Sequence, residues 1–234
     1  MSKVAVSWTG GKDSCLAFYE AEMMGYNVDR LVTFAPSQSV FLAHPLDFIR
    51  LQANALGLPH STLDVSEPFD LGYEAAITVL RERDGIGTLV TGDIAEVAGH
   101  EQDWMVERAR RCNVDLIRPL WHRDRAELLR RVLEIKLKVM FSCVKQPWFT
   151  DDWLGRGLNT VAVARLIEMG SQMGLDICGE QGEYHTLVLD GPLFKKRIRV
   201  DSYSKRSADS VSYLALESFR LERKSAADPA DELV

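Results

Sequence analysis

The sequence lacks paired cysteines. Its four cysteines are scattered, with no C-x-x-C spacing among them: Cys15, Cys112, Cys143 and Cys178. This spacing fits neither a zinc site nor a small disulfide scaffold. It is typical of reduced thiols, and we therefore expect a cytoplasmic protein.

The sequence also lacks a long apolar run and an excess of positive charge. No stretch is apolar for long enough to cross a bilayer, and Met1–Lys3 leads into a strand rather than a signal peptide. The net charge of −6 argues against broad binding of nucleic acid. We expect no membrane partner and no general nucleic-acid partner, and a homodimer is left open.

At 234 residues the chain is long enough to bury a full core. Apolar periodicity predicts strands at 3–8, 28–35, 60–65, 88–91, 114–117 and 138–144, with helices at 12–24, 45–56, 68–83, 101–112 and 125–135. This alternation predicts an α/β fold whose parallel sheet is covered by helices on both faces. After this region the regular alternation of strands and helices ends. The pattern then predicts a helix at 160–173 and strands at 184–189, 196–201 and 211–221. We expect a nucleotide-binding domain at 1–146, a smaller α+β domain at 147–222 and a disordered tail at 223–234.

The segment Thr9–Ser14 lies where the first strand turns into a helix through Gly10 and Gly11. Backbone N–H groups at a helix N-terminus bind anions, and glycines let the backbone approach a phosphate closely. Lys12 adds a positive charge, and the two terminal residues add hydroxyl groups. The spacing is neither a Walker loop nor G-x-G-x-x-G. The alternative is an ordinary tight turn between a strand and a helix.

A second unusual segment, Cys178–Thr186, has Glu180 and Glu183 flanking glycines and His185 two residues later. The glycines predict a turn with unusual backbone angles. Two carboxylates in such a turn can orient a nucleophile, bind an ammonium ion or hold a metal through oxygen ligands. His185 has a side chain that can change charge near neutral pH. The alternative is a polar hairpin turn.

The Thr9–Ser14 segment resembles the pyrophosphatase loop of the N-type ATP pyrophosphatases. The run Gly179–Lys196 resembles the signature of the diphthine–ammonia ligase family, as do Pro119–Trp121 and Trp153–Arg156. The resemblance spans roughly residues 3–200. It implies a Rossmann-like, HUP-type ATP-pyrophosphatase domain and a second domain that closes over ATP. It also implies that ATP activates a carboxylate, with AMP and pyrophosphate released, and that ammonia then forms the amide, as on diphthine of elongation factor 2.

The resemblance and the residues together assign a site. The expected ATP-binding residues are Thr9, Gly10, Gly11, Lys12, Asp13, Ser14, Thr33, Phe34, His44, Gly92 and Asp93. The expected substrate-binding residues are Gly179, Gly182, Tyr184, Thr186 and Lys195. The expected catalytic residues are Lys12, Asp13, Glu180, Glu183 and His185. No residue is assigned as a metal ligand, and Mg²⁺ is expected to accompany ATP.

Each role has a chemical reason. Lys12, aided by Mg²⁺, offsets charge on the departing pyrophosphate. Asp13 either orients Lys12 or a Mg²⁺-bound water, or caps the helix. The two glutamates bind and deprotonate ammonium, with His185 as proton acceptor. His44 either touches phosphate or is a surface residue, and Lys195 either contacts substrate or flanks an exposed strand.

Two features depart from the archaeal and eukaryotic ligases. His185 stands where those enzymes usually carry Glu, and residues 92–107 lack their Tyr-Gln-Arg pattern. Both features resemble those of bacterial relatives, whose cells lack diphthamide. The identities of the acceptor carboxylate and of the nitrogen donor therefore stay open. One rival is a tRNA-modifying ATP pyrophosphatase, which would need paired cysteines or a basic appendage. Another is a nucleotide-binding sensor without turnover, which the intact Lys12–Ser14 run disfavours.

Overall fold

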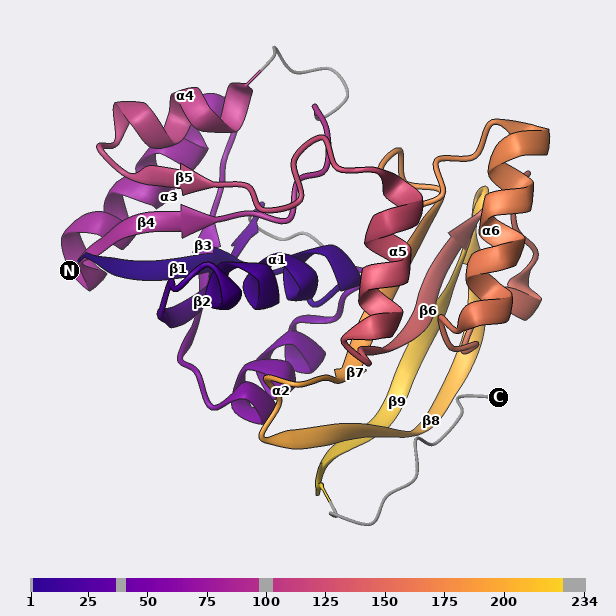
Figure 1. Cartoon of the computed structure of the whole chain (residues 1–234). Coiled ribbons are helices and arrows are strands. Elements are labelled where there is room, and N and C mark those ends of the chain that lie inside the picture. The colour runs from indigo at the N-terminus through magenta and orange to yellow at the C-terminus, as the bar shows by residue number, and fades with distance from the viewer. Residues whose placement is uncertain (1, 37–40, 97–102, 225–234) are drawn as a thin grey trace. The chain divides into compact units, whose positions relative to one another are not determined.

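The computed structural model describes residues 2–36, 41–96 and 103–224 (Figure 1). The chain forms two compact units. The first comprises Met1–Thr9, Asp13–Val40 and Leu58–His122, and the second comprises Gly10–Lys12, Phe41–Gly57 and Arg123–Val234. Within the described ranges, no helix has the length and apolar character needed to span a bilayer.

The first unit contains the predicted parallel sheet. Its strands lie in the order β3-β2-β1-β4-β5, and their bounds are β1 (Lys3–Ser7), β2 (Val28–Ala35), β3 (His60–Asp64), β4 (Ile86–Val90) and β5 (Asp115–Ile117). The order reverses between β1 and β4, and ligands of such sheets bind beyond the carboxyl ends of the strands at this point. The segments after β1 and β4, which contain Thr9 and Gly92, therefore lie where the fold favours a ligand.

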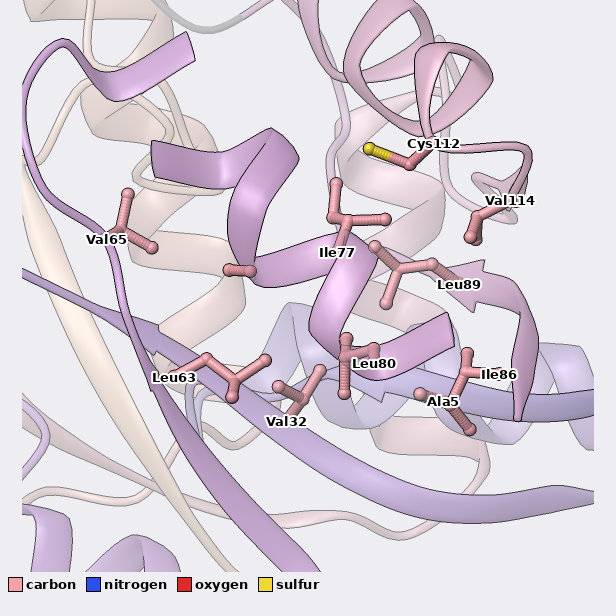
Figure 2. Close-up of a cluster of buried hydrophobic side chains, with 11 residues drawn as sticks. Ala5, Val32, Leu63, Val65, Ile77, Leu80, Ile86, Leu89, Cys112 and Val114 are labelled. Carbon is pink, nitrogen blue, oxygen red and sulfur yellow. The ribbon is translucent and has the colours of Figure 1, made fainter. Parts of the chain in front are cut away.

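Helices α1 (Lys12–Met23), α3 (Phe69–Asp84) and α4 (Trp104–Arg111) accompany this sheet. Figure 2 shows how α3 covers the sheet: Ile77 and Leu80 lie over Ala5, Val32 and Leu89 of the strands. Burial of each large aliphatic side chain stabilises the fold by about 1.5–3 kcal/mol. This packing fixes the strand ends that carry the site residues of the first unit.

The second unit contains an antiparallel sheet in the order β7-β6-β9-β8. Its strands are β6 (Lys138–Lys145), β7 (Tyr184–Asp190), β8 (Lys196–Ala208) and β9 (Val211–Arg223). Its helices are α2 (Leu46–Leu56), α5 (Arg125–Glu134) and α6 (Thr160–Met173), with a 3₁₀ turn, η1, at Asp151–Trp153. The long hairpin of β8 and β9 extends beyond both of the strands predicted there.

The structure corrects the predicted place of strand 138–144. We expected it in the parallel sheet, but β6 pairs antiparallel with β7 on one side and β9 on the other. All six interior residues of β6 are buried. A central strand buried on both faces has the same continuous apolar pattern in either kind of sheet, so the sequence could not separate them.

The compact units also differ from the expected domains. The second unit begins its main run at Arg123 rather than at 147, and it includes α2 from the N-terminal half. The expected tail begins inside β9, which continues to Arg223. Residues 37–40 and 225–234 and the first residues of the helix expected at 101–112 lie outside the described residues.

Candidate active site

The two ends of the Thr9–Ser14 loop are joined by hydrogen bonds. The backbone N–H of Thr9 donates to Ser14 Oγ at 3.3 Å, and the two hydroxyl oxygens are 3.1 Å apart. Between them Gly10 has φ of +81°, a left-handed conformation that glycine adopts without steric cost. The sequence expectation of a glycine-dependent turn at the start of α1 is met here.

Gly92 lies against the first turn of α1. A Cβ atom added to Gly92 would be 2.7 Å from the Asp13 carbonyl carbon and 2.8 Å from the Ser14 nitrogen. Real Cβ atoms do not approach backbone so closely, so the position requires glycine. The first unit therefore brings together two of the loops that were expected to border ATP.

Asp93 follows Gly92 and is half-buried. The hydroxyl of Thr91 donates to its carboxylate at 2.8 Å. Burial raises the pKa of Asp93, although the bond from Thr91 and the charge of Arg118 act against this rise. Burial, followed by the charge of Asp93, also raises the pKa of Tyr73. Asp93 is thus an acidic group held in partly desolvated surroundings.

Thr33 and Phe34, at the end of β2, have partners within the first unit. The Thr33 hydroxyl donates to the Trp8 carbonyl at 2.7 Å and lies 2.8 Å from His60 Nε2. The Phe34 ring lies 5.1 Å from the Tyr73 ring. The Thr33 hydroxyl therefore connects the end of β2 with the segment after β1 and with β3.

Lys12 joins the Thr9–Ser14 loop to the second motif. Its ammonium donates to the Cys178 carbonyl at 2.5 Å, and its backbone N–H donates to Thr186 Oγ1 at 3.1 Å. The ammonium also lies 5.1 Å from the centre of the Tyr184 ring. Lys12 is only 2% exposed. Two segments that were singled out separately in the sequence therefore share direct hydrogen bonds in the second unit.

The turn before β7 is closed by Glu183. Its carboxylate accepts the backbone N–H of Asp176 at 3.1 Å and that of Gln181 at 2.9 Å, and its side chain is buried. The Tyr184 hydroxyl donates to the Ile177 carbonyl at 2.7 Å. These bonds give Glu183 and Tyr184 a role in shaping the turn.

Glu180 differs from Glu183 because it is exposed. The glycines on either side of it, Gly179 and Gly182, have φ of +79° and +80°, which confirms the predicted unusual backbone angles. At Gly179 a Cβ atom would lie 2.8 Å from the Tyr184 carbonyl oxygen. The two glutamates of the motif therefore have different surroundings, and Glu180 is the one that a small molecule in solvent could reach.

His44 and His185 form an edge-to-face pair with ring centres 5.3 Å apart. His44 Nε2 donates to the Thr186 carbonyl at 3.1 Å. Burial, then the nearby His185, lowers the pKa of His44 to about 3. Burial, then the charge of Lys12, lowers the pKa of His185. The lowered pKa favours the neutral form of both rings.

Lys195 lies apart from this cluster. Its backbone N–H donates to the Ala55 carbonyl at 2.8 Å, and its side chain lies against Gly57 at the C-terminal end of α2. Helix α2 has 11 residues and is therefore about 16 Å long, and His44 lies just before its other end. The structure therefore groups His44 with Thr186 and does not group Lys195 with them.

Sequence reasoning missed Gln52. Its side chain is completely buried and donates hydrogen bonds at 2.8 Å to the carbonyls of Gly10 and Val188. One signal was available: Gln52 lies in the buried stripe of α2, between Ile49 and Leu56. A polar residue in an apolar stripe must have a hydrogen-bonding partner.

The residues present fit a phosphate ligand. In the first unit, the loop supplies two hydroxyl groups and a backbone that passes close to Gly92. Among the described residues, no group of three or more His, Cys, Asp or Glu side chains could hold a metal ion.

Two family models together match most of the chain. Residues 2–113 match the diphthamide synthase N-terminal domain, and residues 124–221 match the diphthamide synthase C-terminal domain. The diphthine–ammonia ligase of Mus musculus is 29% identical over 262 residues, covering 98% of this chain and 96% of that protein. The diphthine–ammonia ligase of Homo sapiens is 28% identical over 259 residues, covering 97% and 95%.

A solved structure, described as a predicted subunit of tRNA methyltransferase from Methanocaldococcus jannaschii, aligns with 81% of this chain and 98% of its own. It is 17% identical to this chain, with a TM-score of 0.46. The family models cover both parts of the chain, and the curated relatives match along nearly its full length. The chain belongs to the diphthine–ammonia ligase family, and thereby to the ligases that form carbon–nitrogen bonds.

Proposed function

We propose that this chain is an ATP-dependent amidoligase of diphthamide synthesis, which adenylates a carboxylate and transfers ammonia to it. The observation that carries the proposal is the pair of hydrogen bonds from Lys12 to the second motif, at Cys178 and Thr186. These hydrogen bonds connect the charged group that would bind phosphate with the segment that would bind ammonia. The names of the relatives support the class of reaction.

The loop would hold the β- and γ-phosphates of ATP. Loop N–H groups and the Thr9 and Ser14 hydroxyls would donate to phosphate oxygens, and Lys12 would offset the charge that grows on pyrophosphate as it leaves. Lys12 would exchange its bond to Cys178 for one to phosphate. Mg²⁺ bound to the triphosphate would supply further positive charge. The positive end of α1 favours the same anion.

The acceptor carboxylate would attack the α-phosphorus, and pyrophosphate would leave. Ammonia would then attack the carbonyl carbon and displace AMP, which keeps one oxygen from the original carboxylate. Glu180, which is exposed, is suited to bind ammonium from solvent. In its neutral form the His185 imidazole can accept the proton that ammonium must lose. Burial, followed by the charge of Lys12, lowers the pKa of His185 and favours this neutral form.

For the acceptor, the family implies diphthine on elongation factor 2. His185 stands where the resemblance expects glutamate, and it pairs with His44 through their rings. An imidazole ring carries no negative charge, so His185 presents less negative charge to an acceptor than a glutamate would. We therefore test diphthine first and treat a different carboxylate as the alternative acceptor.

The experiment incubates the purified protein with ATP, Mg²⁺ and ammonium, in parallel with diphthine-bearing elongation factor 2 and with an extract of source cells. Anion-exchange chromatography then separates the nucleotides. AMP and pyrophosphate that appear only when an acceptor is present support the amidoligase. ADP and phosphate would contradict the mechanism, and tight binding of ATP with no cleavage in either sample would favour a sensor. A third sample contains tRNA instead of these acceptors, and cleavage that depends on the tRNA would favour the tRNA-modifying class.

A further inference from the structure

Gln52 is a buried amide in the otherwise apolar stripe of α2. Its nitrogen Nε2 donates to the Gly10 carbonyl and to the Val188 carbonyl, both at 2.8 Å. A primary amide has two N–H groups, and a carbonyl oxygen can only accept. Both N–H groups of Gln52 are therefore used, and the two carbonyls fix which way the amide faces.

Gly10 accommodates this side chain. A Cβ atom added at Gly10 would overlap the Gln52 carboxamide, and φ at Gly10 is +81°. The Gly10 carbonyl also accepts the Val188 backbone N–H at 3.0 Å. The Gly10 peptide is thus bonded to strand β7 and to helix α2, and its position depends on both.

Residues 10–12 are attached to β7 at two further points besides this amide. The first is the bond between Gly10 and the Val188 N–H, and the second is the bond from the Lys12 N–H to Thr186 Oγ1. The Gln52 amide joins the same two chain segments from the side of α2. Peptide planes are rigid, so fixing the Gly10 carbonyl also fixes the direction of the N–H group that follows it.

We propose that Gln52 is a positioning residue for the phosphate loop. By bridging Gly10 and Val188 it sets the orientation of the loop peptides whose N–H groups receive the triphosphate. The inference rests on the proposed function, because it takes the ligand of the loop to be ATP. Gln52 lies outside both sequence motifs and would be a determinant of ATP affinity.

The test compares Gln52→Glu with Asn54→Asp. Both variants replace an amide with a carboxylate on the same helix, but Asn54 is exposed. In Gln52→Glu a carboxylate oxygen faces two carbonyl oxygens and cannot donate to both. Gln52→Met keeps the length and apolar packing of the side chain and serves as the second variant, in case the carboxylate prevents folding.

Calorimetry measures the Kd of ATP, steady-state kinetics give the KM for ATP and for ammonium, and hydrogen exchange follows the peptide that spans residues 9–14. In Gln52→Glu and Gln52→Met we expect ATP Kd and KM to rise about tenfold, the effect of losing roughly one buried hydrogen bond. We also expect faster exchange in the loop and an unchanged KM for ammonium. Asn54→Asp should stay within about twofold of the unmodified protein.

A purely structural amide would lower thermal stability while leaving the ATP Kd of the folded variant unchanged. That result, with ATP bound normally by the unmodified protein, would overturn the role of Gln52 and leave the proposed function intact. If the unmodified protein binds no ATP, the proposed function fails, and the role of Gln52 in ATP binding fails with it.

Discussion

The ammonium of Lys12 donates to the carbonyl oxygen of Cys178, which lies 166 positions later in the chain, at a distance of 2.5 Å. The ammonium is buried beside the Tyr184 ring. A buried cation requires a hydrogen-bonding partner, and here the Cys178 backbone provides one. The arrangement keeps the charge of Lys12 inside the protein.

Replacement of this charge tests its part in catalysis. We expect Lys12→Met to lower kcat/KM for ATP by about 10²–10³, the usual effect of removing one preorganised group that stabilises transition-state charge. Methionine keeps the length of the side chain, so circular dichroism should report a native fold. Lys3→Met, which removes an exposed lysine of β1, is the matched control. If Lys12→Met has the activity of the control, Lys12 does not act on phosphate.

Variants of the two glutamates of the second motif should separate effects on stability from effects on activity. Glu183→Gln replaces a buried carboxylate that accepts two backbone N–H groups, and an amide oxygen cannot serve both while its own N–H group faces one of them. We expect the free energy of unfolding in urea to fall by about 2–3 kcal/mol.

Glu180→Gln changes an exposed residue, and its free energy of unfolding should stay within about 0.5 kcal/mol of the unmodified protein. Its KM for ammonium should rise instead, because the proposed carboxylate that binds the cation is gone. Equal unfolding curves for the two variants would show that Glu183 does not hold the turn. An unchanged KM for ammonium in Glu180→Gln would remove Glu180 from the mechanism.

The sequence predicted most elements because each depends on neighbours in the chain. Helix α6, for example, has the predicted bounds 160–173 and is capped by the Asn159 side chain. The partner of β6 was not predictable, because its apolar pattern fits both kinds of sheet. The bond between Lys12 and Thr186 joins residues 174 positions apart, and no local pattern encodes such a contact.

The candidate site was predicted by motif rather than by geometry. The motifs identified Lys12 and the 178–186 turn, but they could not distinguish the buried Glu183 from the exposed Glu180, because that difference arises from folding. They also could not show that His44 and His185 are neighbours. Gln52 lies outside both motifs, and its hydrogen bonds to Gly10 and Val188 join segments that are far apart in the sequence.

The histidine pair predicts a dependence of stability on pH. The unfolded chain binds a proton at His44 below about pH 6.5, whereas the folded chain does so only near a pKa of about 3. Between these values the unfolded state holds more protons, so this contribution to stability is complete above about pH 6.5 and is lost as the pH falls toward 3. The free energy of unfolding changes by less than about 1.4 kcal/mol per pH unit, because a half-buried ring keeps some solvent contact.

Urea unfolding at several pH values measures this slope. His44→Gln should unfold with a shallower dependence on pH between about 6.5 and 3 than the unmodified protein. His122→Gln, which removes a surface histidine, is the matched control and should leave the slope in place. If the slopes of the unmodified protein and His44→Gln agree, His44 is not desolvated in the folded protein.

Transfer of oxygen from the acceptor to AMP tests the amidoligase mechanism most directly. The acceptor carboxylate is labelled with ¹⁸O and incubated with the protein, ATP and ammonium, and AMP is analysed by mass spectrometry. The account predicts AMP that carries one ¹⁸O atom, because the carboxylate oxygen that attacks the α-phosphorus leaves with AMP when ammonia forms the amide. Amide formation with the label in inorganic phosphate, or with unlabelled AMP, would contradict it.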